Sequence, residues 1–85
     1  MIESNTTVTA TETLDCTGLL CPLPVYKAGV VLNRLQQGDI LELVTTDPGA
    51  LEDVPAMTRQ RGDVLLSAGQ AGETQRFRIQ KGGTR

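Results

Sequence analysis

The stretch Cys21-Pro22-Leu23-Pro24 fixes the start of the first helix in this 85-residue chain. Proline is tolerated only in the first turn of a helix, where its missing N–H would have no partner in any case. Downstream of the two prolines, apolar residues recur with the helical period at Val25, Ala28, Gly29, Leu32 and Leu35. We therefore predict a helix from this turn to about residue 35, with Cys21 at or beside its N-cap.

Segments rich in β-forming residues lie on both sides of this helix. We predict strands over residues 13–16, 40–45, 63–68 and 74–80, with a turn over 69–73 joining the last two. In the last strand Phe77 and Ile79 alternate with Arg76, Arg78 and Gln80, which indicates one buried and one solvated face. We interpret Arg76 and Arg78 as the solvated face of an edge or near-edge strand.

A second helix is signalled by Asp47-Pro48, an acidic cap followed by a proline at the first helical position. Because Pro55 lies inside the pattern that follows, we predict a broken first turn and a new cap at Asp53. The helix would then cover 54–61 and end at Gly62. The acidic residues of this segment are assigned to helix capping or, alternatively, to a surface for a basic partner: Asp47, Glu52 and Asp53.

The element order β-α-β-α-β-β predicts an α/β (α+β) fold, a two-layer sandwich with a four-stranded mixed sheet and two helices on one face. The last two strands form an antiparallel hairpin, and the earlier β-α-β units favour parallel pairing; the lateral strand order stays open. Residues 1–12, rich in Thr, Ser and Asn, are predicted to be a flexible polar tail. Residues 13–83 form the single domain. Gly29 is expected to allow close packing of the first helix on the sheet.

Composition excludes several classes of protein. Lys and Arg total 8 and Asp and Glu total 10, and the chain has no His, no Trp and two Cys. Without His, a Ser-His-Asp or Cys-His enzyme and a His-ligated metal or haem site are excluded. Two cysteines cannot complete a four-thiolate zinc or iron–sulfur site in one chain, so no metal is expected.

Location and partners are constrained by the same composition. The sequence has no run of about 18 apolar residues that could cross a membrane, and we expect no signal peptide, which makes the cytoplasm the expected location. The one basic cluster, Arg76, Arg78, Lys81 and Arg85, lacks solvent-facing interleaved aromatic residues that could stack on bases, so we expect no direct nucleic-acid binding.

Cys21 is the candidate reactive residue. A cysteine at a helix N-terminus is expected to favour its thiolate, which is the nucleophilic form. The alternative is a small buried residue in a Pro-rich turn. Cys16 has three interpretations: a strand residue in the core, a second thiol that resolves or relays for Cys21, or part of a metal site shared with a second chain.

The run Leu14-Asp15-Cys16-Thr17-Gly18-Leu19-Leu20-Cys21-Pro22-Leu23-Pro24 resembles the Asp-x-x-Gly-x-x-Cys-Pro-x-Pro signature of the TusA/SirA-like sulfur-carrier proteins. The resemblance extends over residues 13–83, through Gly38-Asp39, Asp47-Pro48, Asp53-x-Pro55 and the closing residues 78–83. It implies a sulfurtransferase that carries sulfane sulfur as a persulfide on Cys21, with no separate cofactor. It also implies a relay for tRNA thiolation, molybdenum-cofactor synthesis or sulfur oxidation.

The resemblance also implies partners and supporting residues. The sulfur donor would be a protein such as a cysteine desulfurase or a rhodanese-like protein, and the acceptor a cysteine of another protein. Pro22 and Pro24 would shape the turn at Cys21, Gly18 would turn the loop through its backbone, and Asp15 would fix that loop by hydrogen bonds. Asp15 is not expected to be a base, because a carboxylate near Cys21 would oppose thiolate formation.

Several departures and alternatives accompany this resemblance. Many relatives have a further cysteine in the second helix, where this chain has Ala56-Met57-Thr58, and Cys16 stands where cysteine is uncommon. A dithiol redox or redox-sensing module using Cys16 and Cys21 is the main alternative, and a non-catalytic interaction domain is a third. Lys27 and Arg34 are the candidate partner contacts, and we expect a monomer.

Overall fold

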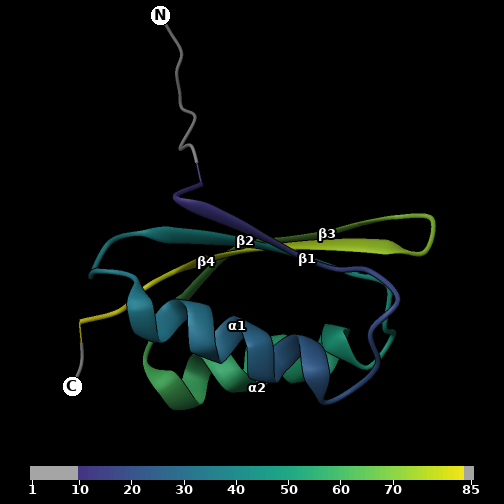
Figure 1. Ribbon diagram of the computed structural model, residues 1–85, viewed down its shortest axis with the longest axis horizontal. Helices are drawn as coiled ribbons and strands as arrows, with labels where there is room; N and C mark the ends of the chain where they lie inside the picture. Colours follow the sequence, from purple (N-terminus) through teal and green to yellow (C-terminus); the bar gives the residue numbers. More distant parts are fainter. Residues whose placement is uncertain (1–9, 84–85) are drawn as a thin grey trace, which may run out of the picture.

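The computed structural model describes residues 10–83, which form two helices and a four-stranded sheet. The elements follow in the order β1 (Glu12–Cys16), α1 (Leu23–Arg34), β2 (Ile40–Thr45), α2 (Ala50–Arg61), β3 (Val64–Ala71) and β4 (Thr74–Gln80). The strand order is β1-β2-β4-β3; β1 and β2 are parallel, and the other two pairs are antiparallel. Both helices cover the same face of the sheet (Figure 1). The predicted two-layer α+β fold is confirmed.

The sheet begins slightly earlier than predicted. Thr11 donates its N–H to the carbonyl oxygen of Ile40 at 2.7 Å, and Glu12 opens β1. The polar tail was expected over residues 1–12. Its last two residues, Thr11 and Glu12, therefore pair with the sheet, whereas residues 1–9 lie outside the described residues.

The core lies between the helices and the two central strands. The inward-facing residues of β2 and β4, Leu41, Leu43, Phe77 and Ile79, are at most 1% exposed. The helices cover them with buried apolar residues, among them Ala28, Leu32 and Val54. Burying an apolar side chain of this size contributes roughly 1.5–3 kcal/mol, so this layer is a major source of apolar stabilisation. Within residues 10–83, neither helix is long and apolar enough to span a membrane.

The second helix is continuous, so the predicted break at Pro55 is wrong. The helix begins at Ala50, two residues after the first position expected at Pro48, with Gly49 as N-cap and Pro55 inside it. Proline removes the N–H that would pair with the carbonyl of Leu51. Leu51 is an exposed position, 45% accessible, so water can replace that partner. The tertiary packing of Val54, Met57 and Thr58, which are all buried, holds the helix through the proline.

The last two strands also differ from the prediction. β4 is an inner strand next to the edge strand β3, so the near-edge alternative for Arg76 and Arg78 is confirmed, and these residues lie on the face away from the helices. Both arginines bind Glu42 of β2, at 3.0 Å and 3.4 Å. β3 continues to Ala71 through pairing of Gly69 with Arg76, and the turn contains only Gly72 and Glu73, with Gly72 at a φ of +61°. The segment predicted as a turn over 69–73 is therefore mostly strand.

Gly29 does not allow close packing, contrary to expectation. A Cβ added at Gly29 would meet no heavy atom within 4 Å, apart from its own helical surroundings. Because α1 is otherwise regular there, Gly29→Ala is expected to stabilise the domain by about 0.5–1 kcal/mol through the higher helix propensity of alanine. Urea denaturation of the two proteins measures this difference. A destabilised variant would contradict the open space seen beside the helix.

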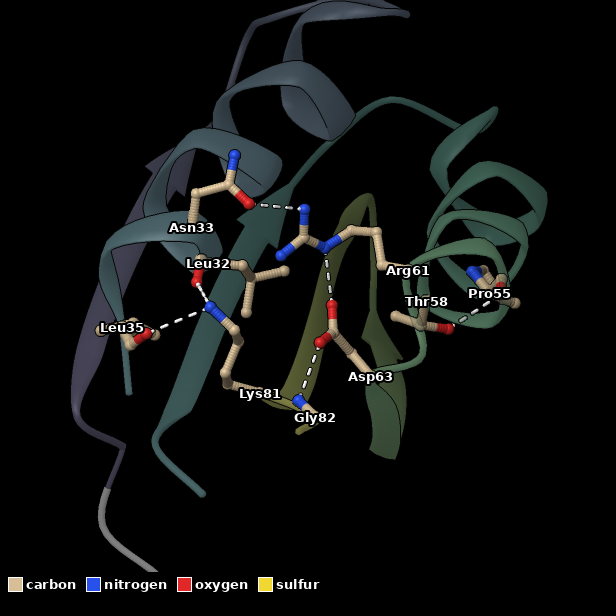
Figure 2. A network of polar contacts seen from close by, with 9 residues as sticks. All are labelled: Leu32, Asn33, Leu35, Pro55, Thr58, Arg61, Asp63, Lys81 and Gly82. Atoms are coloured by element: carbon tan, nitrogen blue, oxygen red, sulfur yellow. Dashed lines mark hydrogen bonds and ion pairs between the residues drawn. The ribbon is translucent and has the colours of Figure 1, made fainter. Parts of the chain in front are cut away.

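Polar contacts close the end of the sandwich that lies opposite Cys21 (Figure 2). Lys81 donates its ammonium to the carbonyls of Leu32 and Leu35 at the end of α1, at 2.6 Å and 3.1 Å. Asp63, whose side chain is 2% exposed, accepts from the N–H of Gly82 at 2.8 Å and from Arg61 Nε at 2.7 Å. The residues after β4 are thereby tied to the ends of both helices.

Candidate functional site

Two loops meet at Cys21 because β1 and β2 are parallel. The carboxyl ends of parallel strands lie at the same edge of a sheet, so the loop from β1 to α1 adjoins the loop from β2 to α2; Figure 1 shows both on the right. Asp47 Oδ2 accepts the backbone N–H of Cys21 at 2.8 Å. Thr46 Oγ1 accepts the N–H of Gly18 at 2.9 Å. The second loop therefore holds the first at two points.

Asp15 and Gly18 shape the loop that carries Cys21. The carboxylate of Asp15 accepts the backbone N–H of Thr17 at 2.9 Å and also accepts its hydroxyl. These hydrogen bonds hold the pKa of Asp15 below its usual value. Gly18 has a φ of +84°, a conformation that favours glycine. Asp15 and Gly18 thus stabilise the conformation of this loop. Their contribution to the function of Cys21 stays a prediction.

Pro22 and Pro24 occupy the start of α1 as the sequence predicts. Pro22 is the N-cap, the Cys21–Pro22 peptide is cis, and Pro24 is buried. The N–H of Leu23 donates to the carbonyl of Leu20 at 2.9 Å. Because proline has no N–H and the amide of Leu23 is engaged, the first turn offers fewer donors to the sulfur than an ordinary helix start.

The expectation that Cys21 favours its thiolate is wrong for the free protein. Cys21 Sγ lies 3.2 Å from Asp53 Oδ2, in hydrogen-bond contact. This hydrogen bond, with smaller contributions from desolvation and from the charges of Asp53 and Asp47, raises the pKa of Cys21. A carboxylate that accepts the S–H favours the thiol, and two negative charges disfavour the thiolate.

Asp53 and Asp47 are site residues that the sequence analysis assigned to capping or to an acidic surface. Asp53 is in the first turn of α2 and is not an N-cap, since the helix starts at Ala50. The signal that could have revealed the contact was the predicted β-α-β pairing, because it places the start of the second helix beside the cysteine loop.

Cys16 and Cys21 have different environments. Cys21 is exposed, whereas Cys16 is 0% exposed and packs in the hydrophobic core. Burial raises the pKa of the Cys16 thiol. The structure thus places Cys16 as a core strand residue and does not bring it to the surface with Cys21. Among residues 10–83, no cluster of acidic residues and cysteines is arranged to hold a metal ion.

The two candidate partner contacts lie at different distances from the site. Lys27 is in the first half of α1 and lines a groove of about 320 Å³ together with Leu14, Tyr26, Val30 and Val31. Arg34 is at the opposite end of α1 from Cys21, where it pairs with Glu12 at 3.2 Å. Only Lys27 is therefore placed to contact a protein docked over Cys21. Exposed apolar side chains extend from the cysteine along α1: Leu20, Leu23, Tyr26 and Val30.

Comparison with known sequences identifies similar proteins. The family described as Sulfurtransferase TusA matches residues 12–81. The chain is 37% identical over 70 residues to the sulfur carrier protein TusA of Allochromatium vinosum, covering 82% of this chain and 92% of that one. It is 52% identical over 59 residues to a protein of Neisseria meningitidis serogroup A named as a candidate sulfur carrier, covering 69% of this chain and 80% of its relative.

A solved structure supports the fold. The crystal structure of the SirA-like protein from Desulfitobacterium hafniense matches with a TM-score of 0.75. The match covers 85% of this chain and 99% of the other, at 20% sequence identity. At that identity the likeness shows the fold alone.

Proposed function

Because this chain belongs to the TusA sulfurtransferase family, we propose that it is a sulfur carrier that bears sulfane sulfur as a persulfide on Cys21. The observation that carries the proposal is the placement of Cys21. Its sulfur is exposed at the tip of a loop that is anchored through Gly18 and the Cys21 amide. A sulfur carrier needs a thiol that is both accessible and fixed, so that successive partners find it in one geometry.

The chemistry requires only thiols. The sulfur of Cys21 attacks the terminal sulfur of a donor persulfide, the donor's S–S bond breaks, and the donor leaves as a thiol that has taken the proton of Cys21. The products are a donor thiol and a Cys21 persulfide, so atoms and electrons balance. Delivery repeats the exchange, with an acceptor cysteine attacking the terminal sulfur and Cys21 leaving. A chain without histidine can perform both steps.

The partners are a sulfur-donor protein, such as a cysteine desulfurase or a rhodanese-like protein, and an acceptor protein. The exposed Leu20 and Leu23 flank Cys21 and supply apolar contact area for such partners, and Lys27 adds a charge one turn further along α1. The carrier would act as a cytoplasmic monomer in a relay for tRNA thiolation, molybdenum-cofactor synthesis or sulfur oxidation.

The dithiol redox alternative is less well supported. A disulfide between Cys16 and Cys21 requires Cys16 to be reached by another thiol, and Cys16 is 0% exposed in the core. The end of β1 would have to open first.

Intact-protein mass spectrometry tests the proposal. After exposure to a cysteine desulfurase with cysteine, or to polysulfide, the wild-type protein is expected to gain the mass of one or more sulfur atoms, and Cys21→Ser to gain none. Loss of two hydrogens on mild oxidation, dependent on Cys16, would instead favour the redox module. Neither change would favour a non-catalytic interaction domain.

A further inference from the structure

The carboxylate of Asp53 is placed against the sulfur that the proposed relay uses. Asp53 lies in the first turn of α2 and is partly buried, and its Oδ2 atom is 3.2 Å from Cys21 Sγ. The rest of the site explains the position of the cysteine backbone without it, since Asp47 and Thr46 already hold the loop. The contact between Asp53 and the sulfur therefore calls for a role of its own.

Resting on the proposed function, we propose that Asp53 is a latch that distinguishes the empty carrier from the loaded one. In the empty carrier Cys21 has a proton to donate, and Asp53 holds the thiol by accepting it. In the loaded carrier the same carboxylate repels the persulfide and turns its terminal sulfur toward the solvent. Asp53 is thus a positioning residue for both states of Cys21.

The contrast follows from the acid–base chemistry of the two forms. A hydropersulfide is a stronger acid than the corresponding thiol, so after loading the terminal sulfur loses its proton to water and becomes an anion. An anion has no hydrogen to donate to Asp53, and the attraction seen in the empty form is replaced by repulsion between like charges. Loading itself leaves the count of protons unchanged, because the donor thiol takes the proton that Cys21 gives up.

The second acidic group near the sulfur acts in the same direction as Asp53. Asp47, from the loop before α2, also opposes a negative charge on Cys21, more weakly than Asp53. The cation Lys27 on α1 favours a thiolate, but it acts on the buried Cys16. The thiolate fraction of the empty carrier is therefore kept low, which slows its reaction with stray electrophiles and disulfides, whereas the loaded carrier presents an ionised terminal sulfur.

Alkylation of the empty protein tests the latch without any sulfur donor. The rate of modification of Cys21 by iodoacetamide is measured as a function of pH, with Cys21→Ser as the blank for Cys16. In Asp53→Asn we expect several-fold faster alkylation at neutral pH and a midpoint displaced to lower pH. Glu52→Gln is the matched control, since it removes one charge from the same turn at an exposed position, and should follow the wild type.

The latch would be overturned if wild type and Asp53→Asn had the same pH profile of alkylation. It would also be overturned if the midpoint in Glu52→Gln moved as far as in Asp53→Asn. Circular dichroism checks that each variant is folded, and Asp53→Ala replaces Asp53→Asn if the amide perturbs the helix. This arm uses no persulfide, so its result does not depend on whether the chain carries sulfur.

The second arm compares loaded and empty protein. Polysulfide-treated and untreated samples are alkylated at neutral pH, and the ratio of their rates is determined by mass spectrometry. We expect a high ratio of loaded to empty alkylation rate in the wild type. The ratio should be several-fold lower in Asp53→Asn, because Cys21 of the empty variant is no longer held as a thiol by the carboxylate. An unchanged ratio would contradict the latch, whereas a wild type that accepts no sulfur would contradict the proposed function alone.

Discussion

Replacing Gly82 with alanine is expected to destabilise the domain by about 3 kcal/mol, at the upper end of what overpacking costs. The added Cβ would overlap the carbonyl oxygen of Gly62 and lie 2.8 Å from its carbonyl carbon. Both atoms belong to the backbone, so no side-chain rotation relieves the overlap. In a domain of this size the melting temperature should fall by roughly 10–20 °C.

The surroundings of Gly82 explain why the backbone cannot yield. The N–H of Gly82 donates to the buried carboxylate of Asp63, and Lys81 before it is held by two carbonyls at the end of α1. Moving Gly82 away from Gly62 would lengthen these hydrogen bonds and leave polar groups without partners, which adds to the cost.

Gly83→Ala is the matched control one residue further along. The atoms nearest to its Cβ would be those of the side-chain amide of Gln37, which is exposed and can rotate away, so we expect a change within about 0.5 kcal/mol. Thermal unfolding by circular dichroism compares the three proteins. Similar melting temperatures for Gly82→Ala and the wild type would mean that the chain end is not held as the contacts indicate.

The sequence was sufficient where local chemistry decides the structure. Pro22 and Pro24 restrict the backbone by themselves, so the start of α1 and the position of Cys21 beside it could be predicted from a few residues. The alternation around Phe77 and Ile79 identified the buried face of β4 for the same reason. It did not identify the strand as central, because a central strand with one open face alternates in the same way as an edge strand.

The rest depends on contacts between distant segments. Pro55 predicts a break from its own chemistry, and only the burial of Val54 and Met57 against the core reveals that α2 continues through it. That continuity places Asp53 in the first turn of the helix, facing Cys21. Asp53 was therefore assigned to helix capping for the same reason that the start of the helix was misplaced.

Removing the side chain of Asp47 is expected to slow sulfur transfer by about 10- to 100-fold, a loss typical of a reacting group displaced by about 1 Å. In Asp47→Ala the Cys21 amide loses its 2.8 Å carboxylate contact, and the N–H of Gly49 loses an acceptor at 3.2 Å. Asp47 is 8% exposed, so water replaces these contacts poorly. The rate is measured by mass spectrometry, following movement of labelled sulfur from loaded carrier to an acceptor protein.

The same substitution should have the opposite effect on simple thiol reactivity. Asp47 contributes to the raised pKa of Cys21, so its removal favours the thiolate and faster alkylation. Transfer to a protein falls because it needs a fixed sulfur, whereas alkylation by a small reagent does not. Asp47→Asn separates the two effects, since it removes the charge and keeps one acceptor oxygen. We expect it to alkylate like Asp47→Ala and to transfer sulfur at an intermediate rate. If Asp47→Asn and Asp47→Ala transferred equally slowly, the charge of Asp47 rather than its hold on the loop would govern delivery.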